Sequence, residues 1–174
     1  KIFLKSNQEV LPKEPEMLIA LWTGARSDAS WYSRESYCDF YDIKGIVDGL
    51  LHALKIEAIR FTNLPADLCT YTRPGFSAQI LAGDVSLGLI GEIHPQVIAY
   101  FNVKQAVYIF EINFDHLIPL ISETTSSKSI PKFPAVFRDI TIHVDKQIET
   151  QDIFETAQNF KERLADGFDL IDVF

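Results

Sequence analysis

The chain has few of the residues that mark specialised classes of protein. Its two cysteines, Cys38 and Cys69, are too few for a disulfide framework and have no paired metal-ligand spacing. No apolar run approaches the roughly 20 residues that cross a bilayer, and the start has no basic region followed by an apolar one. We therefore expect free thiols, no membrane span, no signal peptide and a cytoplasmic location.

Positive charge is also scarce. The chain has 16 Lys and Arg against 24 Asp and Glu, a formal net charge of −8 at pH 7. Proteins that mainly bind nucleic-acid phosphates usually carry a basic patch or a high pI. An RNA contact therefore needs a local basic cluster or a basic partner, because the overall field repels a polyanion.

Apolar residues are plentiful. They make up 47% of the 174 residues, enough to bury a core in one domain, or in one domain and part of another. A polar run, SETTSSKS at residues 122–129, has the composition of a linker and predicts domains at 1–128 and 129–174. Because the chain begins without Met and stops in an apolar run, we expect it to be a piece of a longer protein.

The first domain alternates strand and helix signals. The apolar run at 17–22 predicts a buried strand. Asp39 is placed to cap a helix whose apolar residues recur at spacings of three and four from residue 40 to 54. Gly45 and Gly49 fall inside that helix, so we expect close packing against a sheet to offset their poor helix propensity.

A hairpin is predicted by strands at 77–82 and 85–92, joined by two turn residues. A further strand is predicted at 106–113, and a short helix follows His94, with Pro95 at its first position. The fold class is therefore α+β, a mainly antiparallel sheet with flanking helices.

In the second domain, the pattern of apolar and polar residues predicts a strand at 137–145, a helix capped by Thr150 and a strand at 169–174. This β-α-β order is the first half of a ferredoxin-like unit. The missing third strand normally lies between the first two. We therefore predict that residues 129–174 pack on a second copy of the chain or are loosely held.

Four runs of sequence occur in a distinctive order. They are DFYDIKGIV at 39–47, RPGFSAQ at 73–79, GEIHP at 91–95 and FPAVFRDI at 133–140. Their order and spacing resemble the beta subunit of phenylalanyl-tRNA synthetase. The resemblance implies a class II synthetase-like core without catalytic residues, followed by the start of a ferredoxin-fold anticodon-binding domain.

The resemblance also implies a function. Class II activation needs one arginine on the ATP phosphates and another near the adenine, and none of the six arginines lies in such a context. We expect this piece to be inactive and to bind no cofactor. It would support the catalytic alpha subunit of an α2β2 ligase that joins phenylalanine to tRNA with ATP and magnesium. In the family, the magnesium-binding carboxylates precede this piece, and editing takes place elsewhere in the beta subunit.

An alternative is a free-standing enzyme or binding domain that uses Glu92 and His94 as an acid/base pair. The structural reading, which we favour, is that His94 caps the following helix or makes a subunit contact. The other three histidines have no second ligand at metal spacing, so we expect no zinc site; they are His52, His116 and His143.

Several residues are candidates for subunit or tRNA contact: Arg73, Glu92, His94, Lys132, Phe133 and Arg138. For Arg138 we favour an ion pair with Asp139 or a nearby carboxylate. For Phe133 we favour a packing role at the junction of the two domains. Four aromatic residues near Arg26 and Arg34 combine base-stacking groups with positive charge. We favour the interpretation that these aromatic residues pack in the core or anchor loops. They are Trp22, Trp31, Tyr32 and Tyr37.

Overall fold

The computed structural model describes residues 2–3, 11–28, 30–32, 34–65, 67–122, 132–160, 165 and 167–173. The chain divides into two compact units, Lys1–Thr125 and Ser126–Phe174. Each unit is described by itself.

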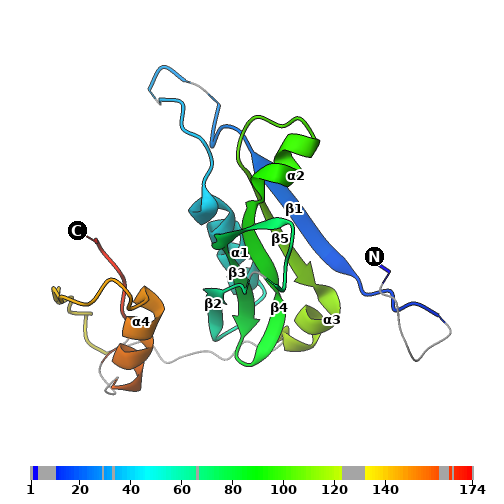
Figure 1. Ribbon diagram of the computed structural model, residues 1–174. Coiled ribbons are helices and arrows are strands. Elements are labelled where there is room, and N and C mark those ends of the chain that lie inside the picture. Colours follow the sequence, from blue (N-terminus) through cyan, green and yellow to red (C-terminus); the bar gives the residue numbers. More distant parts are fainter. Residues whose placement is uncertain are drawn as a thin grey trace. The chain divides into compact units, whose positions relative to one another are not determined.

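The first unit is built on an antiparallel sheet. Its five strands lie in the order β1-β5-β4-β3-β2 (Figure 1). All four neighbouring pairs are antiparallel. The prediction of an α+β fold with a mainly antiparallel sheet is confirmed. The strands are β1 (Met17–Thr23), β2 (Ile59–Asn63), β3 (Thr72–Ala82), β4 (Val85–Ile93) and β5 (Val107–Asn113).

The predicted hairpin is formed by β3 and β4. Ala82 pairs with Val85, so the turn has two residues, and Gly83 takes a φ of +57° that glycine adopts without strain. Strand β2, which was not predicted, continues the sheet beyond β3.

Strand β1 lies at the edge of the sheet, where β5 is its neighbour. Leu18, Ala20 and Trp22 pack against the core, whereas Ile19 and Leu21 are 46% and 63% exposed. The prediction of a buried strand is therefore wrong. An uninterrupted apolar run supplies two apolar faces, but only one face of this edge strand is covered.

Helix α1 (Phe40–Ala53) packs on the sheet through Ile43, Val47 and Leu51, each at most 1% exposed. Full burial of such side chains contributes about 1.5 to 3 kcal/mol each. Gly45 and Gly49 are exposed, and a Cβ at either position would meet nothing within 4 Å. The predicted packing of this helix against a sheet is confirmed, and it involves the apolar face, because the helical spacing places the two glycines away from the sheet.

Short helices follow two of the strands. Helix α2 (Pro95–Tyr100) begins at Pro95, as predicted, with His94 as its N-cap. Helix α3 (Phe114–Leu117) and a 3₁₀ turn (Ile118–Leu120) follow β5, and Leu117 is buried in the core.

In the second unit the described residues form one helix, α4 (Thr150–Asn159). Its N-cap is Glu149, without a side-chain capping bond, so the prediction that Thr150 is the cap is wrong. The strand predicted at 137–145 is not formed, and residues 169–173 of the strand predicted at 169–174 contain none either, while Phe174 lies outside the described residues. Alternation supplies an apolar face, but a strand also needs a hydrogen-bonding neighbour, and this part of the described chain offers none.

Across the described residues, no helix is both long enough and apolar enough to span a membrane.

Candidate functional site

The run RPGF interrupts β3. Thr72 pairs with Ile93 and Ser77 with Gly91, so the residues between Thr72 and Ser77 bulge out of the ladder. Pro74 has no N–H to give to a neighbouring strand, and Gly75 has a φ of +77°. The sequence therefore forces a bulge here, and the bulge brings Arg73 and Phe76 together.

Arg73 holds Glu92 of the neighbouring strand. Its Nη1 lies 3.1 Å from Oε1 and 3.3 Å from Oε2 of Glu92. The guanidinium carbon lies 3.8 Å from the centre of the Phe76 ring, a cation–π contact. The Glu92 side chain is only 12% exposed. Its carboxylate is therefore already engaged in an ion pair.

Glu92 also faces the phenol-bearing side chain of Tyr108 across β4 and β5. Burial first, and then the negative charge of Glu92, raise the pKa of Tyr108. The phenol therefore stays protonated at neutral pH. A protonated phenol and an ion-paired carboxylate do not form an acid/base couple poised near pH 7.

His94 acts as a helix cap. Its Nδ1 accepts a hydrogen bond of 3.2 Å from the backbone N–H of Gln96. This confirms the structural reading in which His94 caps the following helix. With Glu92 bound to Arg73, the geometry does not favour the alternative of an acid/base pair.

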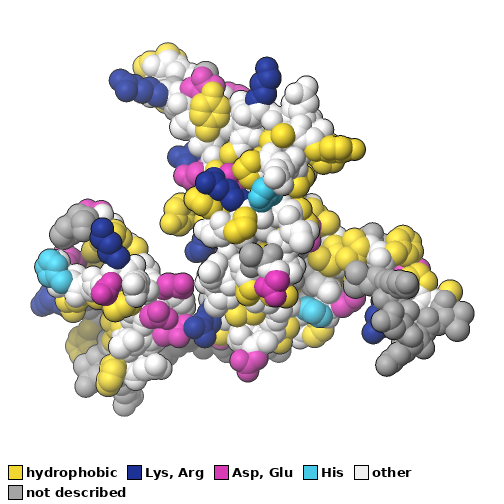
Figure 2. Space-filling view, in the orientation of Figure 1, with side chains coloured by type: hydrophobic (Ala, Val, Ile, Leu, Met, Phe, Trp, Pro, Cys, Tyr) yellow, Lys and Arg dark blue, Asp and Glu magenta, His cyan; other side chains and the backbone are white. Residues whose placement is uncertain are grey.

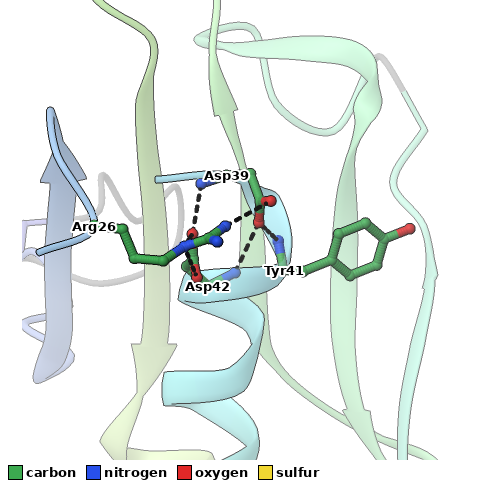
Figure 3. A network of polar contacts seen from close by, with 4 residues as sticks. All are labelled: Arg26, Asp39, Tyr41 and Asp42. Atoms are coloured by element: carbon green, nitrogen blue, oxygen red, sulfur yellow. Dashed lines mark hydrogen bonds and ion pairs between the residues drawn. The ribbon is translucent and has the colours of Figure 1, made fainter. Parts of the chain in front are cut away.

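A second network lies at the start of α1 (Figure 3). Asp39 and Asp42 form a capping box: Asp39 Oδ1 accepts from the N–H groups of Tyr41 and Asp42, and Asp42 accepts from the N–H of Asp39 at 2.8 Å. Arg26 joins both carboxylates. Its Nε lies 2.8 Å from Asp42 Oδ1, and its Nη2 lies 3.0 Å from Asp39 Oδ2.

The charges of this network compensate one another. The N–H of Asp39, and then Arg26, lower the pKa of Asp42, while Asp42 raises the pKa of Arg26. Asp39 was predicted as a cap, and this is confirmed. The bonds from Arg26 to the two capping carboxylates were not predicted, because no local sequence pattern links an arginine to a helix cap 13 residues later in the chain.

The aromatic residues near Arg26 divide into two groups. Trp22 packs against the core. Trp31 and Tyr32 are 96% and 78% exposed and contact one another edge to face, with ring centres 5.5 Å apart. Core packing is therefore wrong for this pair, whereas loop anchoring, the other part of the favoured reading, stays a prediction. Base stacking assisted by Arg26 is not supported either, because both carboxylates occupy its guanidinium.

An open pocket of about 300 Å³ lies between residues 24–38 and the beginning of β5. It has no charged lining residue, and burial raises the pKa of the Cys38 thiol, which weakens it as a nucleophile. No group of three or more metal-ligating side chains occurs among the residues that the model describes. The pocket is lined by Gly24, Tyr37, Cys38, Gln105, Ala106 and Tyr108.

The remaining candidate residues belong to the second unit. Lys132, Phe133 and Arg138 are all exposed. Arg138 Nη1 donates a 2.8 Å hydrogen bond to the carbonyl oxygen of Phe137. A role in subunit or tRNA contact stays a prediction for these three residues, as it does for Arg73, Glu92 and His94.

Basic side chains do not gather into a large patch on the face shown in Figure 2, where Lys and Arg are scattered among acidic residues. This distribution agrees with the net charge of −8.

Comparison with known proteins gives a consistent answer along the chain. Phenylalanine–tRNA ligase beta subunits from Syntrophus aciditrophicus and Latilactobacillus sakei are 33% and 32% identical over 174 residues, 100% of this chain and 21% of each relative. The beta subunit from Geobacter sulfurreducens is 31% identical over the same 174 residues. The chain therefore spans about a fifth of the length of these relatives.

A family model described as the phenylalanyl tRNA synthetase beta chain CLM domain matches residues 1–114. That range contains the whole five-stranded sheet, the Arg73 bulge and the capped helix α1. Because this match covers more than half of the chain, and the relatives align with all of it, the chain belongs to the phenylalanyl-tRNA synthetase beta chain family.

Proposed function

We propose that this chain is a noncatalytic structural part of a phenylalanine–tRNA ligase, in which it supports a catalytic alpha subunit. The observation that carries the proposal is that Glu92 and His94, the best acid/base candidates, are both engaged in structural bonds. They hold a strand bulge and a helix start in place. The whole α2β2 enzyme would attach phenylalanine to tRNA, with ATP and magnesium bound outside this chain.

Support for a scaffold also comes from electrostatics. A chain with a net charge of −8 repels tRNA at long range, so the main phosphate contacts would come from other parts of the assembly. Lys132, Phe133 and Arg138 are the proposed local tRNA or subunit contacts, and Arg73, Glu92 and His94 are the proposed contacts of the first unit. The cytoplasm, where translation takes place, is the proposed location.

Co-purification tests the partner. The chain, carrying an affinity tag, is produced together with a phenylalanine–tRNA ligase alpha subunit, and aminoacylation is measured for the chain alone and for the complex. We expect a stable complex and no activity from the chain alone. Activity of the purified chain alone would overturn the proposal, and so would a lack of any association with the alpha subunit.

Two variants of His94 distinguish a structural role as a helix cap from a catalytic role as an acid or base. His94→Asn keeps a side chain that can cap a helix, whereas His94→Ala removes the cap. In the assembled enzyme we expect His94→Asn to leave kcat unchanged and His94→Ala to lower stability with kcat retained. A large fall in kcat in both variants, with the fold intact, would instead favour the acid/base alternative.

A further inference from the structure

Residues 24–28, which follow β1, contribute no side chain to the core. Gly24 is half-buried and the next four residues are exposed. Two backbone hydrogen bonds connect this segment to residues 36–38: the N–H of Arg26 donates to the carbonyl oxygen of Ser36 at 2.8 Å, and the N–H of Cys38 donates to that of Gly24 at 3.0 Å. Segments with few buried apolar contacts open locally at a lower free energy than the whole fold.

The start of this segment is anchored and is followed by a hinge. Thr23 Oγ1 donates a hydrogen bond of 2.8 Å to the carbonyl oxygen of Ala106, which ties the end of β1 to the residue before β5. Gly24 has a φ of +92°, and a glycine can move between this conformation and others without a steric penalty. The residues after Gly24 can therefore rotate away from the sheet while β1 stays paired.

The side chain of Arg26 is the strongest link between this segment and the start of α1. Its Nε lies 2.8 Å from Asp42 Oδ1 and its Nη2 lies 3.0 Å from Asp39 Oδ2, and both carboxylates are held in place by the capping box (Figure 3). Hydrogen bonds between charged groups are stronger than neutral ones. Because the Arg26 side chain is 44% exposed, dissolved salt can also screen these ion pairs.

Cys38 lies at the place that this segment covers. It is 7% exposed, and it lines the open pocket together with Gly24. Separation of Gly24 from Cys38 would break their hydrogen bond, widen the pocket and expose the thiol.

We propose that Arg26 is the latch of a local opening, in which its two ion pairs break, residues 24–28 rotate outward about Gly24, and Cys38 becomes accessible while the five-stranded sheet stays folded. The ionic bonds at the start of α1 thus control access to the pocket. Salt favours the open form, because it weakens exposed ion pairs more than it weakens the apolar core.

The first test compares two equally buried thiols. Cys38 and Cys69 are 7% and 6% exposed, and each is studied alone, in Cys69→Ser and in Cys38→Ser. Iodoacetamide is uncharged and alkylates a thiolate, forming a C–S bond with loss of iodide; mass spectrometry follows the reaction. We expect Cys38 to react about tenfold faster than Cys69. Equal rates would show that only global unfolding exposes Cys38, and would overturn the proposal.

The second test removes the latch. In the Cys69→Ser protein, Arg26→Met deletes both ion pairs, and we expect the alkylation rate of Cys38 to rise about tenfold. Arg26→Lys keeps the charge and should give an intermediate rate. Arg73→Met is the matched control, because the Arg73 side chain is 42% exposed and is paired with Glu92 instead; it should leave the Cys38 rate unchanged.

An unchanged Cys38 rate in Arg26→Met, or an equal rise in Arg73→Met, would contradict the latch. Circular dichroism and chemical denaturation show that each variant is folded and that the rise is not a loss of global stability.

The third test leaves the latch intact. Between about 0.05 M and about 1 M sodium chloride the Debye length falls severalfold, and we expect the Cys38 rate in Cys69→Ser to rise about twofold to threefold. The rate in the variant that also carries Arg26→Met should not depend on salt. The same salt dependence with and without Arg26 would overturn the proposal.

Discussion

Gly88 on β4 lies directly against the carbonyl oxygen of Glu111 on β5, and a Cβ at residue 88 would overlap that oxygen. The register pairs Gly88 with Ile112, in the middle of the sheet. The close approach involves backbone on both sides, so a rotamer change cannot relieve it. The strand is therefore restricted to glycine at this position.

Gly88→Ala is expected to destabilise the first unit by about 3 kcal/mol, the upper part of the range for overpacking, because the two strands must separate. Chemical denaturation with circular dichroism measures the change. Gly45→Ala is the control: it lies on the exposed face of α1 with nothing near its Cβ, and should stabilise the protein by about 0.5 to 1 kcal/mol. Equal effects of the two substitutions would contradict the assigned close approach.

The capping box at α1 predicts a second effect. Asp39→Ala removes the acceptor for two N–H groups and one arm of the Arg26 contact, so we expect a loss of about 1 kcal/mol in unfolding free energy. Asp48→Ala on the same helix is matched in exposure, 45% against 49%, and loses only an ion pair with Lys44. Its expected cost is about 0.3 to 0.5 kcal/mol. A cost for Asp48→Ala as large as that for Asp39→Ala would contradict the role of the cap.

Asp42 predicts a dependence on pH. Its pKa is lower in the folded chain than in the unfolded chain, so its ionised form stabilises the fold. This contribution is fully present above the unfolded pKa, near 4, and is lost as the pH falls through the lower folded value. The difference in unfolding free energy between wild type and Asp42→Asn should therefore be positive at pH 7 and shrink below about pH 4. A difference that is constant from pH 7 to pH 3 would disprove this linkage.

The ion pair of Arg73 and Glu92 predicts coupling between the two residues. Arg73→Met leaves a largely buried carboxylate without its partner, so we expect a loss of about 1 kcal/mol, moderated by the 42% exposure of Arg73. In the double variant with Glu92→Gln the loss should be smaller than the sum of the single losses. A double-mutant cycle measures this coupling, and strictly additive losses would show that the contact does not contribute.

Local signals predicted much of the fold of the first unit. The cap at Asp39, the two-residue turn of the hairpin and Pro95 at the start of α2 each act within a few residues, and all three are confirmed. These features depend on backbone geometry and nearby hydrogen bonds, which sequence spacing expresses directly.

Non-local features could not be predicted in this way. The run at 17–22 gives no sign of whether its strand is central or at an edge, because that depends on the order of strands in the sheet. The contact of Arg26 with the cap of α1 depends likewise on how two distant segments meet. In the second unit, alternation predicted a strand at 137–145, although pairing rather than alternation decides whether a strand forms.

The register of β1 also has a consequence for the order of folding. Strands β3 and β4 are joined by a two-residue turn, whereas Met17 of β1 pairs with Asn113 at the end of β5. Closing the longer loop costs more chain entropy, so the hairpin is expected to form before β1 docks. During synthesis at roughly 5 to 20 residues per second, β1 leaves the ribosome on the order of 10 seconds before its partner. The first of these five strands to be made therefore cannot join the sheet until β5 is complete, and during this interval its apolar residues are open to chaperones and to neighbouring nascent chains.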